Sequence, residues 1–125
     1  MSAPPARRAR RRAEKSGRRA EWLAAQFLRL KGFSLIARRY KTPGGEIDLI
    51  AKRGRLVVFT EVKARAGFDD AIFAVTPAAQ RRISAAAAMF LARHPALADS
   101  QMRYDIIAVA GWRIRHIADA WRDGD

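Results

Sequence analysis

A chain of 125 residues, half of them hydrophobic, is long enough for one domain with a buried core, but too short for two ordinary domains. Because it contains no cysteine, disulfides, thiolate zinc sites and cysteine nucleophiles are excluded. Its net charge of +13, from 25 basic and 12 acidic side chains, predicts a polyanionic partner, most simply nucleic acid. The alternative is that the charge only keeps the protein in solution.

The N-terminal segment carries much of this charge. Residues 1–20 contain eight basic residues and one acidic residue, a net charge of +7. Residues 1–15 are largely Pro, Ala and Arg, a composition too polar to bury a core, so we predict a disordered basic arm. An organellar transit peptide has a similar composition, but it fits less well because the segment holds almost no serine.

The sequence offers no segment for a membrane. No apolar run approaches the about 18–20 residues needed to span a bilayer. The N-terminus has positive charge but lacks the apolar stretch of a secretory signal. We therefore expect a cytoplasmic protein with no membrane partner.

The folded part is expected over residues 16–121, with a short tail at 122–125. Leu23, Phe27 and Leu30 follow helical spacing and Gly32 ends the pattern, which predicts a helix at about 16–31. The later elements alternate in type: strands at about 33–41, 46–52 and 55–65, a loop at 66–75, a helix at about 77–94, and strands at about 102–110 and 112–121. This order predicts an α/β domain with a central mixed sheet flanked by helices.

Three ionisable residues interrupt the most apolar part of the chain. Asp48 lies in the second predicted strand, and Glu61 and Lys63 lie on one face of the third. Acids are depleted in strands, and a buried charge must be paired or bound to a metal. The alternative is that Glu61 and Lys63 face solvent and Asp48 pairs with an arginine.

The predicted hairpin brings two of these acids together. With residues 53–54 as the loop, Asp48 lies diagonally next to Glu61, and Glu46 lies opposite Glu61 as a rim residue or a partner of the metal ligands. A loop of odd length would place Asp48 on the other face unless a bulge compensated. Two carboxylates suit Mg²⁺ or Mn²⁺, with the Val62 carbonyl as a further oxygen ligand. Lys63 is placed to orient a water molecule or to stabilise developing charge. The acids are thus tolerated if an ion and a lysine share their charge.

These residues resemble a known family. Asp48 followed by Glu61-Val62-Lys63 is similar to the D…(D/E)-x-K motif of restriction-endonuclease-like nucleases, the PD-(D/E)XK superfamily. The ordered blocks "GGEIDLIA…VVFTEVKAR", "AVTPAAQRRISAAAAMFL" and "YDIIAV" resemble the YraN family of small bacterial proteins over about residues 17–119. That family is similar in turn to archaeal Holliday-junction resolvases.

The resemblance implies a three-layer α/β/α sandwich with metal ligands Asp48 and Glu61 and a catalytic Lys63. In resolvase-like relatives a helix-borne glutamate joins the site, and Glu21 occupies that place here. From the residues alone, Glu21 equally well pairs with an arginine.

Further candidates surround this motif. Those for phosphate or nucleic-acid contact precede the hairpin or follow it on the next helix: Arg38, Arg39, Lys41, Gln80, Arg81 and Arg82. Each has the alternative of an ordinary solvated polar group. The three tryptophans fit a core or lid better than base stacking. Asp105 fits a structural hydrogen-bonding role, and no chemistry is assigned to His94 or His116.

The resulting hypothesis is a nuclease dependent on Mg²⁺ or Mn²⁺ that hydrolyses nucleic-acid phosphodiesters. DNA is the favoured substrate, with branched DNA suggested by the resemblance. By analogy with a junction cut on two strands, we expect a homodimer. The alternatives are a non-catalytic nucleic-acid-binding protein with a nuclease-like fold, and a ribosome- or chromosome-associated basic protein whose acids are structural.

Overall fold

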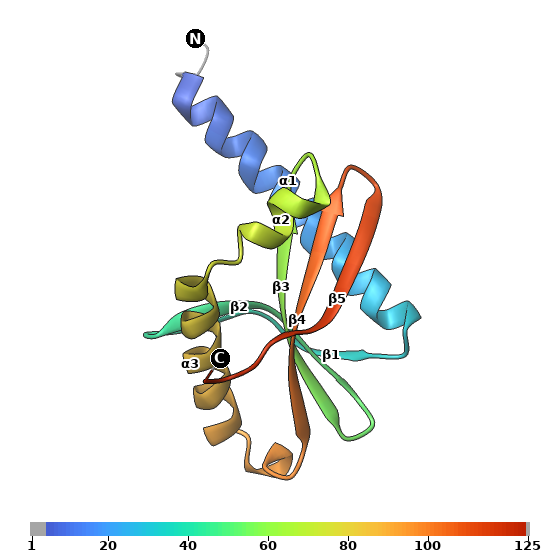
Figure 1. Cartoon of the computed structure of the whole chain (residues 1–125), viewed down its shortest axis with the longest axis vertical. Helices are drawn as coiled ribbons and strands as arrows, with labels where there is room; N and C mark the ends of the chain where they lie inside the picture. Colours follow the sequence, from blue (N-terminus) through green and yellow to red (C-terminus); the bar gives the residue numbers. More distant parts are fainter. Residues whose placement is uncertain (1–4, 125) are drawn as a thin grey trace.

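The structure is a computed structural model that describes residues 5–124 (Figure 1). Its elements, in chain order, are α1 (Pro5–Leu30), β1 (Ser34–Thr42), β2 (Gly45–Arg53), β3 (Leu56–Ala64), α2 (Phe68–Phe73), α3 (Pro77–Ala92), the 3-10 helix η1 (Pro95–Leu97), β4 (Gln101–Ala110) and β5 (Arg113–Trp121). None of the helices within residues 5–124 is both long and apolar enough to cross a bilayer.

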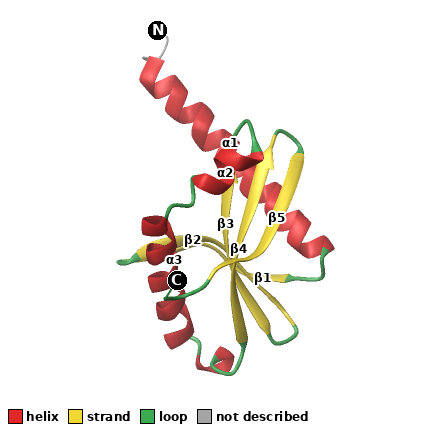
Figure 2. Ribbon diagram, viewed as in Figure 1, coloured by secondary structure: helices red, strands yellow, loops and turns green. Residues whose placement is uncertain are grey.

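Five strands form one mixed sheet in the order β1-β2-β3-β4-β5. Strands β3 and β4 are parallel, and the other neighbours are antiparallel. Helix α1 covers one face, while α2 and α3 lie on the other (Figure 2). The predicted α/β fold, a three-layer sandwich around a mixed sheet, is thereby confirmed, and it is consistent with a restriction-endonuclease-like fold.

Each face of the sheet has its own hydrophobic core. On the α1 side, Ala24 and Leu28 pack against residues such as Val58 and Ile107. On the other side, Ile83 and Phe90 of α3 pack against side chains that include Phe59. Because strand residues alternate between faces, β3 supplies apolar side chains to both cores. Its long apolar run is therefore the centre of the domain.

Helix α1 begins at Pro5, earlier than the predicted start near residue 16. Residues 5–15, expected to be disordered, are helical, and residues 1–4 of the predicted arm lie outside the described residues. Alanine and arginine have high helix propensity, and proline is tolerated in the first turn. Among the side chains that the structure describes, Ala20 is the first buried one along α1. The earlier turns therefore project beyond the sheet (Figure 1).

Two other predictions about local structure were wrong. The loop expected at 66–75 contains the short helix α2. The β2–β3 loop consists of residues 54–55, not 53–54, because Arg53 pairs with Leu56. Gly54 has a φ of +59°, which suits glycine at the first central position of a two-residue hairpin loop. The register therefore moves Glu46 away from Glu61.

The turn between β1 and β2 is held against α3. A Cβ atom placed on Gly45 would lie 2.5 Å from the carbonyl oxygen of Arg82. Only glycine allows the two backbones to approach this closely. The contact fixes the start of β2, the strand that carries Asp48.

Candidate functional site

Asp48 is anchored across the gap between β2 and β3. Recorded pairing of these strands ends with Leu49 opposite Thr60, so continuing the register places Asp48 opposite Glu61. The Asp48 carboxylate accepts a 2.8 Å hydrogen bond from the backbone N–H of Val62. A side chain thus satisfies a β3 donor at the point where pairing with β2 stops, and this bond holds the carboxylate beside β3.

Strand β2 is irregular at Asp48. Ile47 packs on the α3 side and Leu49 on the α1 side, although residues two apart in a regular strand share a face. On β1, Arg38 pairs with Leu49 and Tyr40 with Ile47, which leaves Arg39 facing Asp48.

Arg39 has a φ of +48°, an uncommon conformation for a non-glycine residue. Strained backbone of this kind clusters at functional sites. Here it coincides with the irregular position in the neighbouring strand. The two distortions together mark this edge of the sheet as a candidate site.

Glu61 is 9% exposed and lies next to Asp48. Burial, followed by a hydrogen bond with Asp48 and the charge of Asp48, raises the pKa of Glu61 to about 9. The positive charge of Lys63 opposes this shift, whereas Glu46 adds to it. The two predicted carboxylates therefore converge, and Lys63 alone does not compensate for their combined negative charge.

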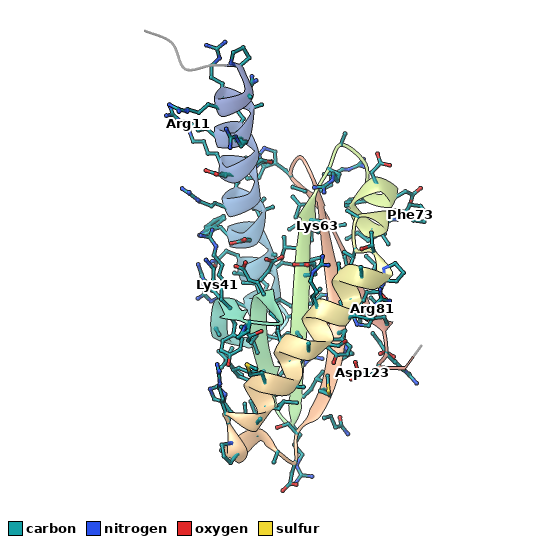
Figure 3. All side chains as sticks on the ribbon, turned by 90° about the vertical axis from the view of Figure 1, so that its left-hand side faces the viewer. Arg11, Lys41, Lys63, Phe73, Arg81 and Asp123 are labelled. Carbon is teal, nitrogen blue, oxygen red and sulfur yellow. The ribbon has the colours of Figure 1, made fainter. Side chains whose placement is uncertain are left out.

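A cleft of about 320 Å³ opens between α1 and the ends of β2 and β3. Its lining includes Ser16, Gly17 and Glu21 from α1, Asp48 from β2, and Val62 and Lys63 from β3. Figure 3 shows Lys63 on β3, between the projecting part of α1 that carries Arg11 and helix α3. The cleft lies at the carboxyl end of β3, where open α/β sheets commonly bind ligands.

A larger cavity, of about 480 Å³, lies at the other end of the parallel strands. It is lined by residues that include Leu56, Met102 and Trp121. None of the residues predicted for the site lines it. We therefore assign the candidate site to the smaller cleft, because converging ionisable groups are better evidence of chemistry than volume.

Glu21 lies at the cleft and is also ion-paired. The Nε atom of Arg39 donates a 2.8 Å hydrogen bond to the Glu21 carboxylate. This bond and the charge of Glu21 raise the pKa of Arg39, and the charges of Glu46 and Asp48 contribute further. The expected pairing of Glu21 with an arginine is therefore confirmed, and the side chain lies at the cleft where the resemblance implies a site residue.

The other predicted contact residues fall into two groups. Arg38 and Arg39 lie on β1 next to the site, and Lys41 is exposed farther along the same strand. Gln80 donates a hydrogen bond to the carbonyl of Val75. It lines a separate cavity beside the C-terminal segment, together with Arg81, and Arg82 packs on the β1–β2 turn. The α3 residues are thus not gathered with Asp48 and Lys63.

The donor set fits a small oxygen-seeking cation. Within residues 5–124, no group of three or more His, Cys, Asp or Glu side chains is arranged to hold a metal ion. Mg²⁺, however, is commonly held by one or two carboxylates, with waters and substrate phosphates filling the remaining positions. Burial, followed by the neighbouring Asp48 carboxylate, raises the pKa of Glu61, and a cation bound at this pair would offset both effects. Asp48 and Glu61 therefore fit Mg²⁺ or Mn²⁺ as a two-carboxylate site.

Sequence reasoning missed a polar network on β4 and β5, at the opposite edge of the sheet from β1 and β2. Asp105 is fully buried, and its carboxylate lies 2.7 Å from the Nε2 atom of His116 and accepts two 2.8 Å hydrogen bonds from Arg103. The Nδ1 atom of His116 lies 2.9 Å from the ammonium nitrogen of Lys31, just after α1. The network links β4 and β5 to the end of α1.

Burial alone would raise the pKa of Asp105. Hydrogen bonds with His116, Arg103 and the backbone of Asp119 outweigh burial and lower the pKa to about 2. The expected hydrogen-bonding role of Asp105 is confirmed. Asp105 on β4 and His116 on β5 are brought together by the pairing of these two strands.

The tryptophans occupy different environments. Trp121 is 7% exposed and stacks on Tyr104, with ring centroids 5.0 Å apart. Trp22 is 54% exposed and Trp112 is 73% exposed. The core role predicted for tryptophan is therefore confirmed for Trp121 alone.

Comparisons with known proteins identify relatives over most of the chain. The model described as "Uncharacterised protein family UPF0102" matches residues 20–109, a span that contains Asp48, Glu61 and Lys63. A UPF0102 protein of Paramagnetospirillum magneticum is 52% identical over 126 residues, which cover 97% of each chain. A UPF0102 protein of Chelativorans sp. is 56% identical over 104 residues, covering 83% of this chain and 84% of the relative.

Proposed function

This chain belongs to the UPF0102 family, as the resemblance to YraN proteins implied, and on that premise we propose that it is a divalent-metal-dependent nuclease. Its reaction is the hydrolysis of nucleic-acid phosphodiesters. The observation that carries the proposal is the convergence of Asp48 and Glu61 near Lys63. Burial and the neighbouring Asp48 carboxylate raise the pKa of Glu61 although the charge of Lys63 opposes the shift. A structural ion pair would instead lower the pKa of the acid.

Each residue of the site has a distinct task. Asp48 and Glu61 would hold the cation, and the Val62 carbonyl would supply a further oxygen. When bound, Mg²⁺ or Mn²⁺ supplies Lewis acidity at the phosphate and favours ionisation of water. Lys63 orients the attacking water and stabilises the charge that develops as the phosphorus–oxygen bond to the leaving group breaks.

Arg39 has a positioning role in this proposal. Glu21 lines the same cleft, so it can serve as a further acid of the site. Its 2.8 Å ion pair with Arg39 must open or be shared before its carboxylate reaches the cation. The backbone of Arg39 has an uncommon conformation, and this conformation fixes the direction from which the Arg39 side chain approaches Glu21.

The charge of the chain supports a nucleic-acid substrate. The projecting turns of α1 carry Arg7, Arg8, Arg10, Arg11, Arg12 and Lys15. Cations along a helix neutralise phosphates and release counterions, which gives sequence-independent affinity. We favour DNA as the substrate and the cytoplasm as the compartment. A junction with two cut strands would require a homodimer.

A cleavage screen tests the proposal. Duplex, single-stranded, flap and four-way-junction substrates are incubated with the protein in Mg²⁺, Mn²⁺ or EDTA, with Asp48→Asn as the matched control. We expect metal-dependent cleavage of at least one substrate by the wild type and its loss in the variant. Cleavage that is equal in EDTA, or equal in the variant, would contradict the proposal.

A non-catalytic nucleic-acid-binding protein is the second candidate. It is favoured by the ion pair that engages Glu21 and by the absence, within residues 5–124, of a metal-binding group of three or more such side chains. It predicts binding of nucleic acid without metal-dependent turnover. The same screen, with binding measured in parallel, separates the two candidates.

A further inference from the structure

A further cavity lies next to the cleft that contains Glu21, Asp48 and Lys63, which we call the acidic cleft. Its volume is about 410 Å³, and it is lined by Arg18, Glu21 and Trp22 of α1 and by Arg38 and Arg39 of β1. Residues 18, 21 and 22 follow helical spacing, so they lie on one side of the helix. The cavity is therefore a feature of the α1–β1 junction, where a rigid helix meets the edge strand of the sheet.

Glu21 connects this cavity to the cleft that contains Asp48 and Lys63. Its side chain lines both spaces, and its carboxylate is bound to Arg39. Arg39 in turn faces Asp48 across the β1–β2 pair. A chain of nucleotides that enters the acidic cleft can thus continue into the neighbouring cavity.

The chemistry of the lining selects an anion with a flat apolar part. Three arginines and one glutamate line the cavity, and the glutamate is already paired with Arg39. Among the residues that the structure describes, Arg18 forms a 4.0 Å ion pair with the exposed Glu14, which is weak and easily screened. Trp22, 54% exposed, supplies an aromatic surface among these cations.

A second copy of this chain does not suit the cavity, because it would bring a further net charge of +13. A nucleotide meets both requirements, since its phosphate is an anion and its base stacks on an aromatic ring. A base is free to stack in this way only when it is unpaired.

We propose that this cavity binds one unpaired nucleotide next to the phosphate held in the acidic cleft. Its base stacks on Trp22, and Arg18 and Arg38 contact its phosphate. The inference rests on the proposed function for the position of the cleft, and it adds a substrate class. The substrate has an unpaired strand at this point, as in single-stranded, flapped or otherwise frayed nucleic acid.

The test compares two exposed tryptophans. Trp22→Ala and Trp22→Phe alter the cavity, whereas Trp112→Ala removes an exposed ring that stacks on Arg19 outside the cavity. Binding of a labelled oligo(dT) 12-mer and of a blunt duplex is measured by fluorescence anisotropy in EDTA. We expect Trp22→Ala to weaken oligo(dT) binding about 10-fold, Trp22→Phe to retain most of it, and duplex binding to change less than about twofold. Trp112→Ala should leave both affinities within about twofold.

Intrinsic fluorescence tests stacking directly. In the Trp112→Phe/Trp121→Phe double variant, Trp22 is the remaining tryptophan, and oligo(dT) should quench its emission while the duplex should not. If the double variant fails to fold, Trp112→Phe alone is used, because Trp121 is buried and stacked on Tyr104. Emission that stays unchanged while anisotropy reports bound oligo(dT) would overturn the proposal.

Three other results would also overturn it: no binding of oligo(dT) by the wild type, equal losses in Trp22→Ala and Trp112→Ala, or a Trp22→Ala variant that changes from dimer to monomer in sedimentation. The last result would identify the cavity as a contact between copies. Because binding is measured in EDTA, the outcome is independent of cleavage. If Trp22 stacks on oligo(dT) but the protein shows no metal-dependent cleavage, this inference stands and the nuclease proposal fails. If the protein cleaves nucleic acid but Trp22→Ala binds oligo(dT) as well as the wild type does, the nuclease proposal stands and this inference fails.

Discussion

The Asp48 carboxylate on β2 accepts a 2.8 Å hydrogen bond from the backbone N–H of Val62 on β3. One side chain therefore both joins the two strands and presents charge to Glu61, the residue before Val62. Asparagine can accept the same hydrogen bond through its amide oxygen, so Asp48→Asn removes charge while it preserves the link between the strands. This property makes it the most informative substitution at the site.

We first predict the response of stability to metal. Millimolar Mg²⁺ or Mn²⁺ should raise the Tm of the wild type, because a ligand that binds only the folded state stabilises it. Asp48→Asn and Glu61→Gln should lose most of this increase. In EDTA near pH 8, Glu61→Gln should raise the free energy of unfolding, by on the order of 1 kcal/mol. With its raised pKa, Glu61 must take up a proton when the chain folds, and glutamine does not.

Thermal melts with and without metal measure these effects, and Glu46→Gln serves as a control on the rim of the site. If the acids are instead part of a structural ion pair, Glu61→Gln should destabilise the fold and metal should change nothing.

The second prediction concerns Lys63. Lys63→Met keeps most of the side-chain volume but removes the ammonium group, so single-turnover cleavage at saturating protein should slow by about 10²–10⁴-fold. Substrate binding should weaken only modestly, because many other basic side chains are available to contact the phosphates of the nucleic acid. Lys63→Arg should restore little activity, since a planar guanidinium does not replace a compact ammonium.

Lys52→Met is the matched control, because Lys52 lies on β2 toward the opposite end of the hairpin. Cleavage by Lys63→Met within about threefold of the wild-type rate would show that Lys63 has no part in the chemistry.

The third prediction concerns the projecting part of α1. Deletion of residues 1–15 removes six basic residues and one acidic residue. For duplex DNA, each lost phosphate contact should reduce the slope of log K against log salt by about 0.9. The Tm should change little, because burial along the described part of α1 begins at Ala20.

A variant with Arg7, Arg8, Arg10, Arg11 and Arg12 replaced by glutamine keeps the length of the helix and removes only charge. It should reproduce the effect of the deletion. Salt titrations whose slopes equal that of the wild type in both proteins would rule out phosphate contacts by this segment.

The fourth prediction is a pH dependence that originates at Asp105. The pKa of this carboxyl is lowered to about 2 in the folded protein, so the unfolded chain takes up its proton first as the pH falls. Its contribution to stability should be complete above about pH 4 and should disappear as the pH falls toward 2. Urea unfolding between pH 2 and 6 measures this trend.

Asp105→Asn should abolish that part of the pH dependence. It should also lower the free energy of unfolding near neutral pH by about 3–5 kcal/mol, because it breaks a buried charged network. Curves for the wild type and the variant that remain parallel between pH 4 and 2 would contradict the assignment to Asp105.

The fifth prediction tests the contact between the β1–β2 turn and α3. Gly45→Ala places a methyl group 2.5 Å from the backbone oxygen of Arg82, so it should lower the free energy of unfolding by about 1–3 kcal/mol. Gly67→Ala is the control, since a Cβ atom there meets nothing within 4 Å. Chemical denaturation of both variants measures the difference, and equal stabilities would mean that the turn can move away from α3.

Hydrophobic periodicity by itself determined most of the architecture. The strands start and end within about one residue of the predicted positions, because apolar runs bounded by glycine and proline define them. The motif was also visible from the sequence, since Asp48, Glu61 and Lys63 are anomalous in apolar strands. Helix α2 was missed because a segment of six residues is too short to show helical periodicity.

Details that depend on spatial neighbours were decided only by the tertiary structure. The expected loop at 53–54 and the observed loop at 54–55 both keep Asp48 and Glu61 on one face of the β2–β3 hairpin. The backbone conformation of Gly54 selects the observed one. The Arg39–Glu21 pair joins residues 18 apart in the sequence, and the Asp105–His116 pair joins residues 11 apart. The spacing of residues along the sequence indicates which side chains share a face of one helix or strand. Ion pairs between different elements depend on how the sheet and the helices pack.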